Sequence, residues 1–382
     1  MDYKLSREIE RKFWLNSPKT INNLSSEYRQ INIEQLYLSK PEDEYDLRVR
    51  KTVDDCSRIS YTATLKTRPD TNDNIADRYE IETEISEETY LFWLQQNLPF
   101  VKKVRRDFGL GLTADFIEGI DEPLIELEQI ENLNSEESAI VAMTLQYLTS
   151  HCASADQTAY SEQIAWNKLK ENNHDAPILT ADSLAELIFC GDKPSIENPC
   201  FISIGGRSGS GKSTIARELQ KLLNNHFDKD ISARIISTDD YNKGINFLQK
   251  NNGNQPLNFD LPHLYDTETL AKELKNRKEN MQPLPVHSFD WDKSEQIPVI
   301  FPCELHSIII IEGIYADSPE IADLIDFKFH LNIGAATCIG RRVMRSLNNT
   351  QRGNIMSPEA QLRYLIEIAE PTYLQRQLQQ ET

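Results

Sequence analysis

The stretch FISIGGRSGSGKST, residues 201–214, decides the architecture of the second half of this 382-residue chain. Its opening run FISI predicts a buried strand, a glycine-rich loop follows, and a helix is expected to begin near Lys212. The loop fits the pattern GxxxxGK[ST], in which backbone N–H groups at a helix start surround nucleotide phosphates. We expect Lys212 to reach the β- and γ-phosphate oxygens of ATP and the Ser213 hydroxyl to bind Mg²⁺. The predicted nucleotide-binding residues are Gly206, Gly209, Ser210, Gly211, Lys212, Ser213 and Thr214.

The segments beyond this loop alternate between strands and helices. A helix is predicted over 214–223, and strands are predicted in ARIIST (233–238), SIIIIEG (307–313) and KFHLNI (328–333). This order is typical of a parallel sheet with helices on both faces. Strands of such a sheet are buried on both sides, which explains the unbroken isoleucine run at 308–311. We therefore predict an α/β fold for this half.

Charged residues follow these strands in an order that resembles the uridine kinase and phosphoribulokinase branch of the P-loop kinases. Asp239 follows the second strand, Glu312 ends the isoleucine run, and RRVMR at 341–345 lies in a predicted helix. The resemblance implies that Asp239 is the base for an acceptor hydroxyl and that Glu312 supports the metal. It also implies that Arg342 and Arg345 form a lid over the phosphates, although an RRxxR run is also typical of a solvated helix face. Asp260, in NFDLPHLYD, is a candidate for binding a diol of the acceptor.

Two positions depart from the uridine kinase pattern. Uridine kinases usually have a tyrosine shortly after the base and a histidine in a YDF-x-x-H run, whereas this chain has Asn242 and Ser294 there. A site built to bond the polar edge of one substrate rejects that substrate strongly when those partners are lost. We therefore expect this half to bind the phosphates of ATP and to use uridine and cytidine poorly as acceptors. The sequence does not identify the acceptor.

The first 130 residues read instead as short alternating segments separated by polar turns, which is typical of antiparallel strands. Residues i, i+2 and i+4 of a strand share a face, so charges gather on one face of several strands. The charged residues of any single strand are explained by a sheet face that is exposed to solvent. In a closed barrel, however, the acidic and the basic residues would both point inward, where their charges compensate each other. Such an interior suits a polyphosphate and its metal. The acidic set is Glu8, Glu10, Asp115, Glu126 and Glu128, and the basic set is Lys12, Arg48, Arg50, Lys66, Lys103 and Arg105.

The ExExK signature at Glu8, Glu10 and Lys12 resembles that of the CYTH, or triphosphate tunnel metalloenzyme, family. Further elements follow in the family's order: Arg48-x-Arg50, Lys66, the strand at 78–82 with Glu80 and Glu82, Lys103-x-Arg105, Asp115, Glu126-x-Glu128, and Tyr160 with Ser161. The resemblance implies an eight-stranded tunnel whose acidic set holds Mg²⁺ or Mn²⁺. It also implies that Glu8, Glu10 and Lys12 are catalytic, and that the basic set with Glu80 and Glu82 binds a triphosphate attacked by water. The family includes triphosphatases for several substrates and class IV adenylate cyclases, so the fold leaves the substrate open.

The composition limits the partners of the chain. With 41 Lys+Arg against 60 Asp+Glu, the net charge of −19 argues against general binding of nucleic acids or anionic membranes. No apolar run approaches the length of a membrane span, and the six cysteines include no CxxC pair. We expect a cytoplasmic protein whose partners are small triphosphates and nucleotides; a homo-oligomer is compatible with the sequence.

These patterns predict a two-domain protein of α+β and α/β class. The predicted parts are a tunnel domain over 1–170, a linker with a short helix over 171–198, and a uridine kinase-like P-loop domain over 199–382. The leading hypothesis is a bifunctional, metal-dependent enzyme that hydrolyses a triphosphate in the tunnel and transfers phosphate from ATP to a small hydroxylated acceptor. The alternatives are a nucleotide or polyphosphate sensor with one non-catalytic domain, and an adenylate cyclase-type tunnel.

Overall fold

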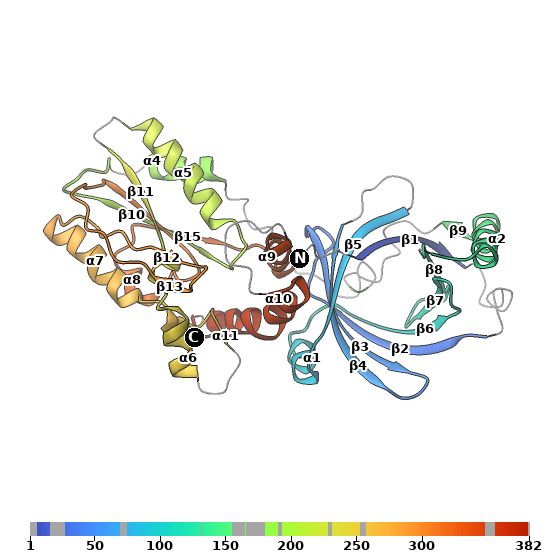
Figure 1. Cartoon of the computed structure of the whole chain (residues 1–382). Coiled ribbons are helices and arrows are strands. Elements are labelled where there is room, and N and C mark those ends of the chain that lie inside the picture. The colour runs from blue at the N-terminus through green and yellow to red at the C-terminus, as the bar shows by residue number, and fades with distance from the viewer. Residues whose placement is uncertain are drawn as a thin grey trace. The chain divides into compact units, whose positions relative to one another are not determined.

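A computed structural model of the chain describes residues 6–15, 27–68, 75–130, 132–154, 165, 180–189, 193–227, 231–252, 257–347 and 356–380. The chain divides into two compact units, whose elements are labelled in Figure 1. The barrel unit contains 1–173, 334–347 and 356–367, and the P-loop unit contains 174–333, 348–355 and 368–382. The domain boundaries predicted above stay predictions, and Tyr160 and Ser161 lie outside the described residues.

Eight antiparallel strands close the barrel. They are β1 (Ser6–Trp14), β2 (Arg29–Tyr37), β3 (Tyr45–Asp54), β4 (Ile59–Thr67), β5 (Ile75–Glu84), β6 (Phe100–Asp107), β7 (Leu112–Ile117) and β8 (Leu124–Glu128). The sheet order is β5-β4-β3-β2-β6-β7-β8-β1, and β1 closes it by pairing also with β5. The predicted eight-stranded antiparallel barrel is confirmed. A two-residue strand, β9 (Ala153–Ser154), pairs with the end of β1.

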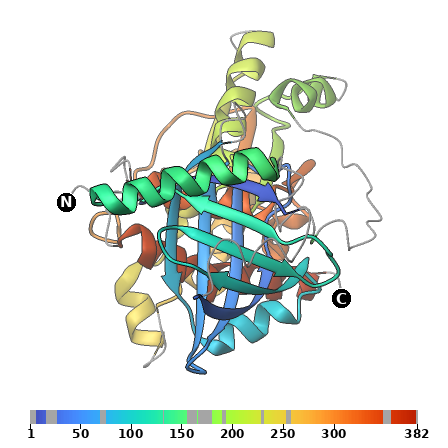
Figure 2. The same cartoon turned by 90° about the vertical axis from the view of Figure 1, so that its right-hand side faces the viewer.

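The barrel is apolar on its outer wall and charged inside. Leu47, Val49 and Leu65 are at most 2% exposed and alternate along β3 and β4 with the charged residues of the basic set. Because strand side chains alternate between faces, the apolar residues point outward, where helices cover them. The helices α9 (Ala335–Leu347) and α10 (Pro358–Tyr364), with α1 (Glu87–Leu94), pack on the β3–β5 wall. On another wall, α2 (Ser135–His151) lies across the strands and packs on Leu112 and Leu127 (Figure 2).

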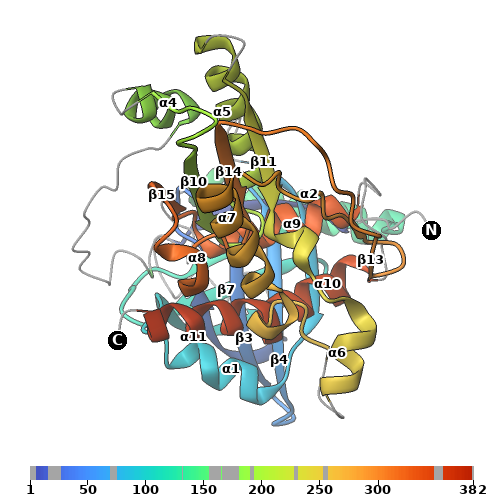
Figure 3. The same cartoon turned by 90° about the vertical axis from the view of Figure 1, so that its left-hand side faces the viewer.

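The P-loop unit is built on four parallel strands in the order β11-β14-β10-β15. They are β10 (Cys200–Gly206), β11 (Ala233–Ser237), β14 (Ile308–Glu312) and β15 (Phe327–Leu331). One face packs on α4 (Ala181–Phe189) and α5 (Lys212–His226), and the other on α7 (Thr267–Asn280) and α8 (Pro319–Ala322), which can be followed in Figure 3. This confirms the predicted α/β sheet. The remaining elements are η3 (Thr238–Tyr241), α6 (Gly244–Asn252), η4 (Pro262–Leu264), β12 (Phe289–Asp290), β13 (Glu295–Gln296), η5 (Leu365–Ala369) and α11 (Glu370–Gln380).

The loop between β10 and α5 depends on glycine. Gly206, Gly209 and Gly211 have φ values of 135°, 91° and 97°, in the left-handed region that side chains disfavour. A Cβ atom on Gly206 would also lie 2.7 Å from the carbonyl oxygen of Leu331 on β15. The backbone can therefore turn directly from the strand into the helix that presents Lys212. In the part of the chain that is described, none of the helices has the length and apolar character of a membrane span.

Candidate functional site

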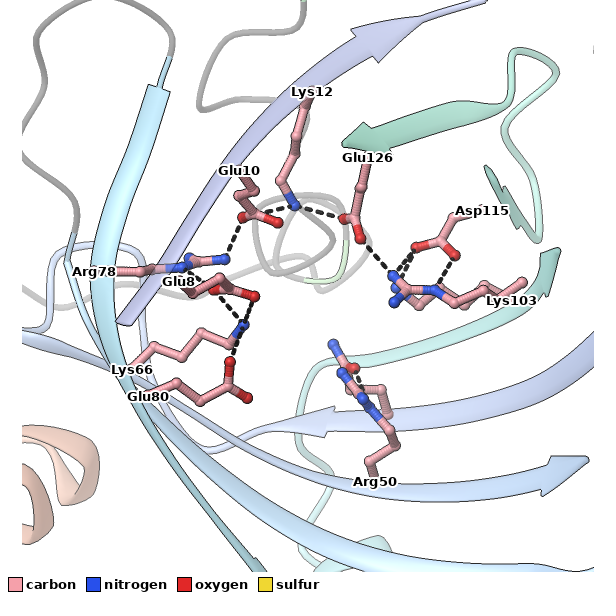
Figure 4. Close-up of polar contacts among 12 residues, drawn as sticks. Glu8, Glu10, Lys12, Arg50, Lys66, Arg78, Glu80, Lys103, Asp115 and Glu126 are labelled. Atoms are coloured by element: carbon pink, nitrogen blue, oxygen red, sulfur yellow. Dashed lines mark hydrogen bonds and ion pairs between the residues drawn. The ribbon is translucent and has the colours of Figure 1, made fainter. Parts of the chain in front are cut away.

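One half of the barrel interior is a network centred on Glu8. Its carboxylate accepts hydrogen bonds from Lys66 Nζ at 2.7 Å and from Arg78 Nε at 2.7 Å (Figure 4). Arg78 also pairs with Glu10, and Lys66 lies 2.9 Å from Glu80. Strands β1, β4 and β5 each supply part of this network, because their inward faces meet where β1 closes the barrel.

The network continues across the other half of the interior. Lys12 Nζ lies 2.6 Å from Glu126 and 3.3 Å from Glu10, so one ammonium joins two carboxylates. Arg105 bridges Glu126 at 2.5 Å and Asp115 at 2.7 Å, and Asp115 also pairs with Lys103. These desolvated charges offset each other, which is the compensation that the sequence pattern predicted.

Arg50 stands apart from this network. Figure 4 shows it on the wall that faces the carboxylates, outside their chain of ion pairs. Its Nε donates to Gln35 at 3.0 Å, and no carboxylate of the described residues lies within ion-pair distance of it. Burial, with the positive charges of Arg48 and Arg105, lowers the pKa of Arg50 to about 10. Arg48 is next to it on the same face of β3, and its buried Nε has no hydrogen-bond partner.

The cations also set the protonation of the interior. Burial raises the pKa of Glu8, but Lys66 and Arg78 outweigh it and lower that pKa to about 2. Burial lowers the pKa of Lys103 to about 8, because Asp115 offsets only part of the cost of desolvation. The side chain of Glu128 is partly exposed at the end of β8, where incomplete solvation of its carboxyl, followed by the nearby charge of Glu8, raises its pKa. The remaining predicted binder on β5, Glu82, is also exposed and accepts from Thr64 Oγ1 at 2.8 Å.

The residue types of the acidic set suit a divalent cation, although their carboxylates do not lie close together as a preformed metal site. Glu10 and Glu126 both approach the Nζ atom of Lys12, and carboxylate oxygens are the ligands that Mg²⁺ and Mn²⁺ prefer. The five acidic residues are nevertheless interleaved with cations. Across the described ranges, the one group of three possible ligand atoms within 4.8 Å of one another is Asp54, Asp55 and Cys56, at the β3–β4 turn.

The P-loop unit assembles its predicted residues at the carboxyl edge of the sheet. Lys212 Nζ donates to the carbonyl oxygens of Gly206 at 3.0 Å and Arg207 at 2.7 Å, which holds it over the loop. Ser213 Oγ donates to Glu312 at 3.0 Å. Burial, followed by the charge of Asp239, raises the pKa of Glu312, so Asp239 in η3 lies near this pair. Ligands of parallel sheets bind at this edge, where adjacent strands end together.

Other predicted nucleotide and acceptor residues lie around this edge. Ser210 is 4% exposed, its amide donates to the carbonyl of Arg207 at 3.1 Å, and Thr214 lies in the first turn of α5. The carbonyl oxygen of Asp260 accepts from Tyr315, three residues beyond the end of β14, at 2.5 Å. Asp260 is thereby attached to the strand that carries Glu312. Arg342 and Arg345 lie on α9, in the barrel unit.

The two positions that depart from the uridine kinase pattern both contact the start of α6. Asn242 is 2% exposed, and its side-chain oxygen accepts from the amide of Gly244 at 2.8 Å, at the start of α6. The carbonyl oxygen of Ser294 accepts from the amide of Ile245 at 3.0 Å. The Asn242 side chain is therefore occupied at the beginning of this helix, whereas the Ser294 contact is made by the backbone and does not involve its hydroxyl.

Sequence reasoning missed several residues of these sites. Arg78 begins the strand that the resemblance included, but it was given no role, although its place two residues before Glu80 on one strand face was a signal for one; it joins Glu8 and Glu10. Gln35 and Tyr37 of β2 were missed because the inward residues of that strand carry no charge. His287 was missed because it belongs to no local motif. Its Nε2 lies 2.9 Å from Glu273, and its ring packs 4.2 Å from that of Tyr241.

Comparison with known proteins bears on the P-loop unit. Residues 201–373 match the Phosphoribulokinase / Uridine kinase family. A uridine kinase of Clostridium perfringens is 30% identical over 181 residues, which span 47% of this chain and 82% of the relative. The chain belongs to the phosphoribulokinase / uridine kinase family. A second relative in this family, a uridine kinase of Clostridium botulinum, is 34% identical over 164 residues, 41% of this chain and 73% of the relative.

Solved structures resemble each unit separately. A putative fructose transport system kinase from Silicibacter sp. TM1040 is 20% identical and covers 52% of this chain and 95% of its own, with a TM-score of 0.40. The barrel resembles the inorganic triphosphatase NE1496, which is 21% identical and covers 43% of this chain and 96% of its own, with a TM-score of 0.27.

Proposed function

We propose that the chain is a bifunctional phosphate-handling enzyme. In this proposal the barrel hydrolyses a triphosphate or a related short phosphoanhydride, and the P-loop unit transfers the γ-phosphoryl group of ATP to a small hydroxylated acceptor. Arg50, which has no carboxylate partner among the described residues, carries the first part of the proposal. The cluster of Lys212, Ser213, Glu312 and Asp239, in a member of a kinase family, supports the second part.

The barrel interior is suited to hold an anion at Arg50. Arg50 is half-buried, and desolvating a guanidinium without a carboxylate partner is costly, which its lowered pKa reflects. A phosphate chain supplies the missing negative charge, and guanidinium groups bind phosphate oxygens through two parallel hydrogen bonds. Arg48 and Arg50 would then grip one end of the chain, while Lys12, Lys66, Lys103 and Arg105 neutralise charge that develops on phosphorus when water attacks.

A divalent cation fits the opposite wall. Glu8, Glu10, Asp115, Glu126 and Glu128 would hold it, and when bound it would withdraw charge from the phosphate oxygens. The residues of the chain supply the rest of the chemistry. Glu8 is held ionised by Lys66 and Arg78 down to about pH 2, so this carboxylate remains charged under all physiological conditions.

Truncation of Arg50 tests the proposed anion site. We expect Arg50→Ala to raise the KM for inorganic triphosphate with a smaller change in kcat, because it removes a ground-state contact worth roughly 2–5 kcal/mol. Arg58→Ala is the matched control, since Arg58 lies in the β3–β4 turn with a side chain 74% exposed. Phosphate release at varied substrate concentration measures both constants. An unchanged KM in Arg50→Ala would contradict the site, and tight binding without turnover in the wild type would favour a sensor.

The pH dependence of triphosphate hydrolysis by the barrel should follow the titration of Lys103. Its pKa near 8 means that Lys103 carries a proton below about pH 8 and loses its positive charge above it. Anion binding favours the protonated form, so we expect kcat/KM for triphosphate to fall as the pH rises from 7.5 to about 9.5. Lys103→Arg keeps the charge at high pH and should flatten this decline. A wild-type profile that stays level to pH 9.5, or an equal decline in Lys103→Arg, would exclude Lys103 as the titrating group.

The proposed kinase chemistry places Asp239 as the acceptor base. It is the second residue after β11 and lies near Glu312, while Ser213 and Glu312 would hold the Mg²⁺ of Mg-ATP. Because the Asn242 side chain is occupied at the start of α6, and a serine stands at 294 where the uridine kinase pattern has a histidine, we propose that the acceptor is a small hydroxylated molecule other than a nucleoside.

An acceptor panel tests this assignment. We expect ADP formation from ATP with some members of a panel of sugars, sugar phosphates and vitamins, and little with uridine or cytidine. Asp239→Asn should lower this rate by about 10²–10⁴, the usual contribution of a positioned base, with little effect on ATP affinity. Asp240→Asn is the matched control for a neighbouring carboxylate. Efficient uridine turnover that Asp239→Asn abolishes would show that the two departures do not affect the acceptor.

A further inference from the structure

Helix α11 contacts both the phosphate-binding loop and the loop that carries Asp260. These two loops hold the residues proposed above to bind the phosphate donor and the acceptor. Both loops and α11 belong to the P-loop unit, which contains residues 174–333 and 368–382. The contacts of α11 therefore bear on both substrates of the proposed kinase reaction.

The contact with the phosphate-binding loop is an ion pair between Glu370 and Arg207. Arg207 Nε donates to Glu370 at 2.8 Å, and the two side chains are only 8% and 13% exposed. Arg207 Nη1 also donates to the carbonyl oxygen of Ile333, two residues beyond the end of β15, at 3.3 Å. Removal of one partner from such a pair is costly, because the remaining charge stays desolvated. Glu370 therefore fixes the side chain of Arg207.

The backbone of Arg207 holds residues that would bind phosphate. Its carbonyl oxygen accepts from Lys212 Nζ at 2.7 Å and from the amide of Ser210 at 3.1 Å. Gly206 precedes Arg207, and a glycine leaves the backbone free to move when the neighbouring side chain is released. Arg207 is thus the link between α11 and Lys212.

Tyr373 supports the same contact one turn further along α11. The guanidinium carbon of Arg207 lies 4.4 Å from the centre of the Tyr373 ring, which is a cation–π contact. The hydroxyl oxygen of Tyr373 lies 3.1 Å from His330 Nε2 of β15, and His330 Nδ1 lies 3.0 Å from Asp317. A Cβ atom on Gly205 of β10 would lie 3.0 Å from Asp317 Oδ2, so this pair fits closely against that strand. The helix is thereby attached to the sheet as well as to the loop.

The contact with the acceptor loop passes through Asn258. Asn258 Nδ2 donates to Thr372 Oγ1 of α11 at 2.8 Å, and Asn258 Oδ1 accepts from the amide of Asp260 at 2.9 Å. One turn after Thr372, the guanidinium of Arg376 lies 4.8 Å from the ring of Tyr315. The hydroxyl of Tyr315 donates to the carbonyl oxygen of Asp260 at 2.5 Å. Two positions of α11 therefore reach Asp260, each through one intermediate residue.

We propose that α11 is a rigid link that fixes the ATP site and the acceptor site relative to each other. Glu370 and Thr372 are its positioning residues. Glu370 acts on the donor through Arg207 and Lys212, and Thr372 acts on the acceptor through Asn258 and Asp260. In-line phosphoryl transfer depends on the distance and alignment between the γ-phosphate and the attacking hydroxyl, so a rigid link between the two sites favours transfer. This inference rests on the proposed kinase function.

Two conservative variants separate the two contacts in the full chain. Glu370→Gln removes the charge that pairs with Arg207, and we expect it to raise the Kd of Mg-ATP about tenfold without changing the acceptor KM. Thr372→Val removes the hydroxyl that Asn258 contacts, and we expect it to raise the KM of the best acceptor in the panel about fivefold without changing the Kd of Mg-ATP. Both variants should lower kcat, because the alignment of the substrates is lost.

Gln375→Ala is the matched control, because Gln375 is exposed on α11 and its loss should change neither constant. A general destabilisation of α11 would weaken the binding of both substrates in both variants. That result, or unchanged constants in both variants, would overturn the proposal.

A double variant checks that Glu370 acts through Arg207. Arg207→Gln should raise the Kd of Mg-ATP as much as Glu370→Gln does, and the double variant should bind Mg-ATP no more weakly than either single variant. Fully additive losses would contradict this path, because the two residues would then act on ATP separately.

Hydrogen exchange tests both contacts without any acceptor. We expect faster amide exchange over 206–212 in Glu370→Gln and over 257–265 in Thr372→Val, each with unchanged exchange in the other loop. Unchanged exchange in both loops would overturn the link. If the wild type phosphorylates no member of the acceptor panel, the proposed kinase function fails, whereas hydrogen exchange and the Mg-ATP titrations still decide whether α11 holds the two loops.

Discussion

Lys212→Ala is expected to lower the affinity for Mg-ATP by about 10²–10³-fold and to abolish ATP-dependent phosphoryl transfer. Lys212 is 6% exposed and is held by the carbonyl oxygens of Gly206 and Arg207, so its ammonium is already directed over the loop. Loss of such a desolvated charge partner of a phosphate costs roughly 3–4 kcal/mol, which corresponds to that change in affinity. Isothermal titration calorimetry with Mg-ATP measures the binding, and ADP formation measures the transfer.

A lysine of the same helix supplies the control. Lys221 is exposed on α5, and Lys221→Ala should leave both ATP affinity and transfer unchanged. The hydrolysis of inorganic triphosphate should continue in Lys212→Ala, because the barrel has its own set of charged residues. Loss of both activities in Lys212→Ala would mean that the two sites are not independent. Full Mg-ATP affinity in Lys212→Ala would exclude the P-loop as the nucleotide site.

Glu10→Gln is expected to lower triphosphate hydrolysis by about 10²–10³-fold, the usual effect of removing one preorganised charged group from such a site. Glu10 is 5% exposed, pairs with Arg78, and shares the Lys12 ammonium with Glu126. The amide keeps the shape of the carboxylate but removes its charge and its affinity for a hard cation. Phosphate release with varied Mg²⁺ and Mn²⁺ measures the effect, and the metal concentration for half-maximal rate should rise.

The isosteric glutamine matters for this test. Glu10→Ala would leave a space beside two buried cations, and breaking a buried pair destabilises by roughly 3–5 kcal/mol, so lost activity could reflect unfolding. Glu84→Gln is the control, because Glu84 is an exposed glutamate of β5. Normal hydrolysis in Glu10→Gln, or undiminished hydrolysis by the wild type in excess chelator, would refute a metal-dependent tunnel.

The interior of the barrel shows how far alternation predicts a site. Glu8, Glu10 and Lys12 were placed on one face by the period of two, and all three lie in the interior network. The same rule predicted an inward Arg48 and Arg50 but could not show that Arg50 lacks a carboxylate partner. That depends on which strands are neighbours, and the β2–β3 pairing places Gln35 opposite Arg50. Because Gln35 is uncharged, the sequence pattern did not indicate that it is the partner of Arg50.

The sequence by itself determined the two folds, the phosphate-binding loop and the inward face of most charged strands. These features are local: strand alternation, glycine at left-handed positions, and a lysine and serine at fixed spacing act over a few residues. Only the tertiary structure decided that Arg78 links Glu8 to Glu10, that the Asn242 side chain and the Ser294 backbone contact the start of α6, and that α9 packs on residues 43–45 before and at the start of β3. Except for the Asn242 contact with Gly244, each of these joins residues more than 40 positions apart in the chain. Such distant pairs are selected by barrel closure and helix packing, which no local pattern encodes.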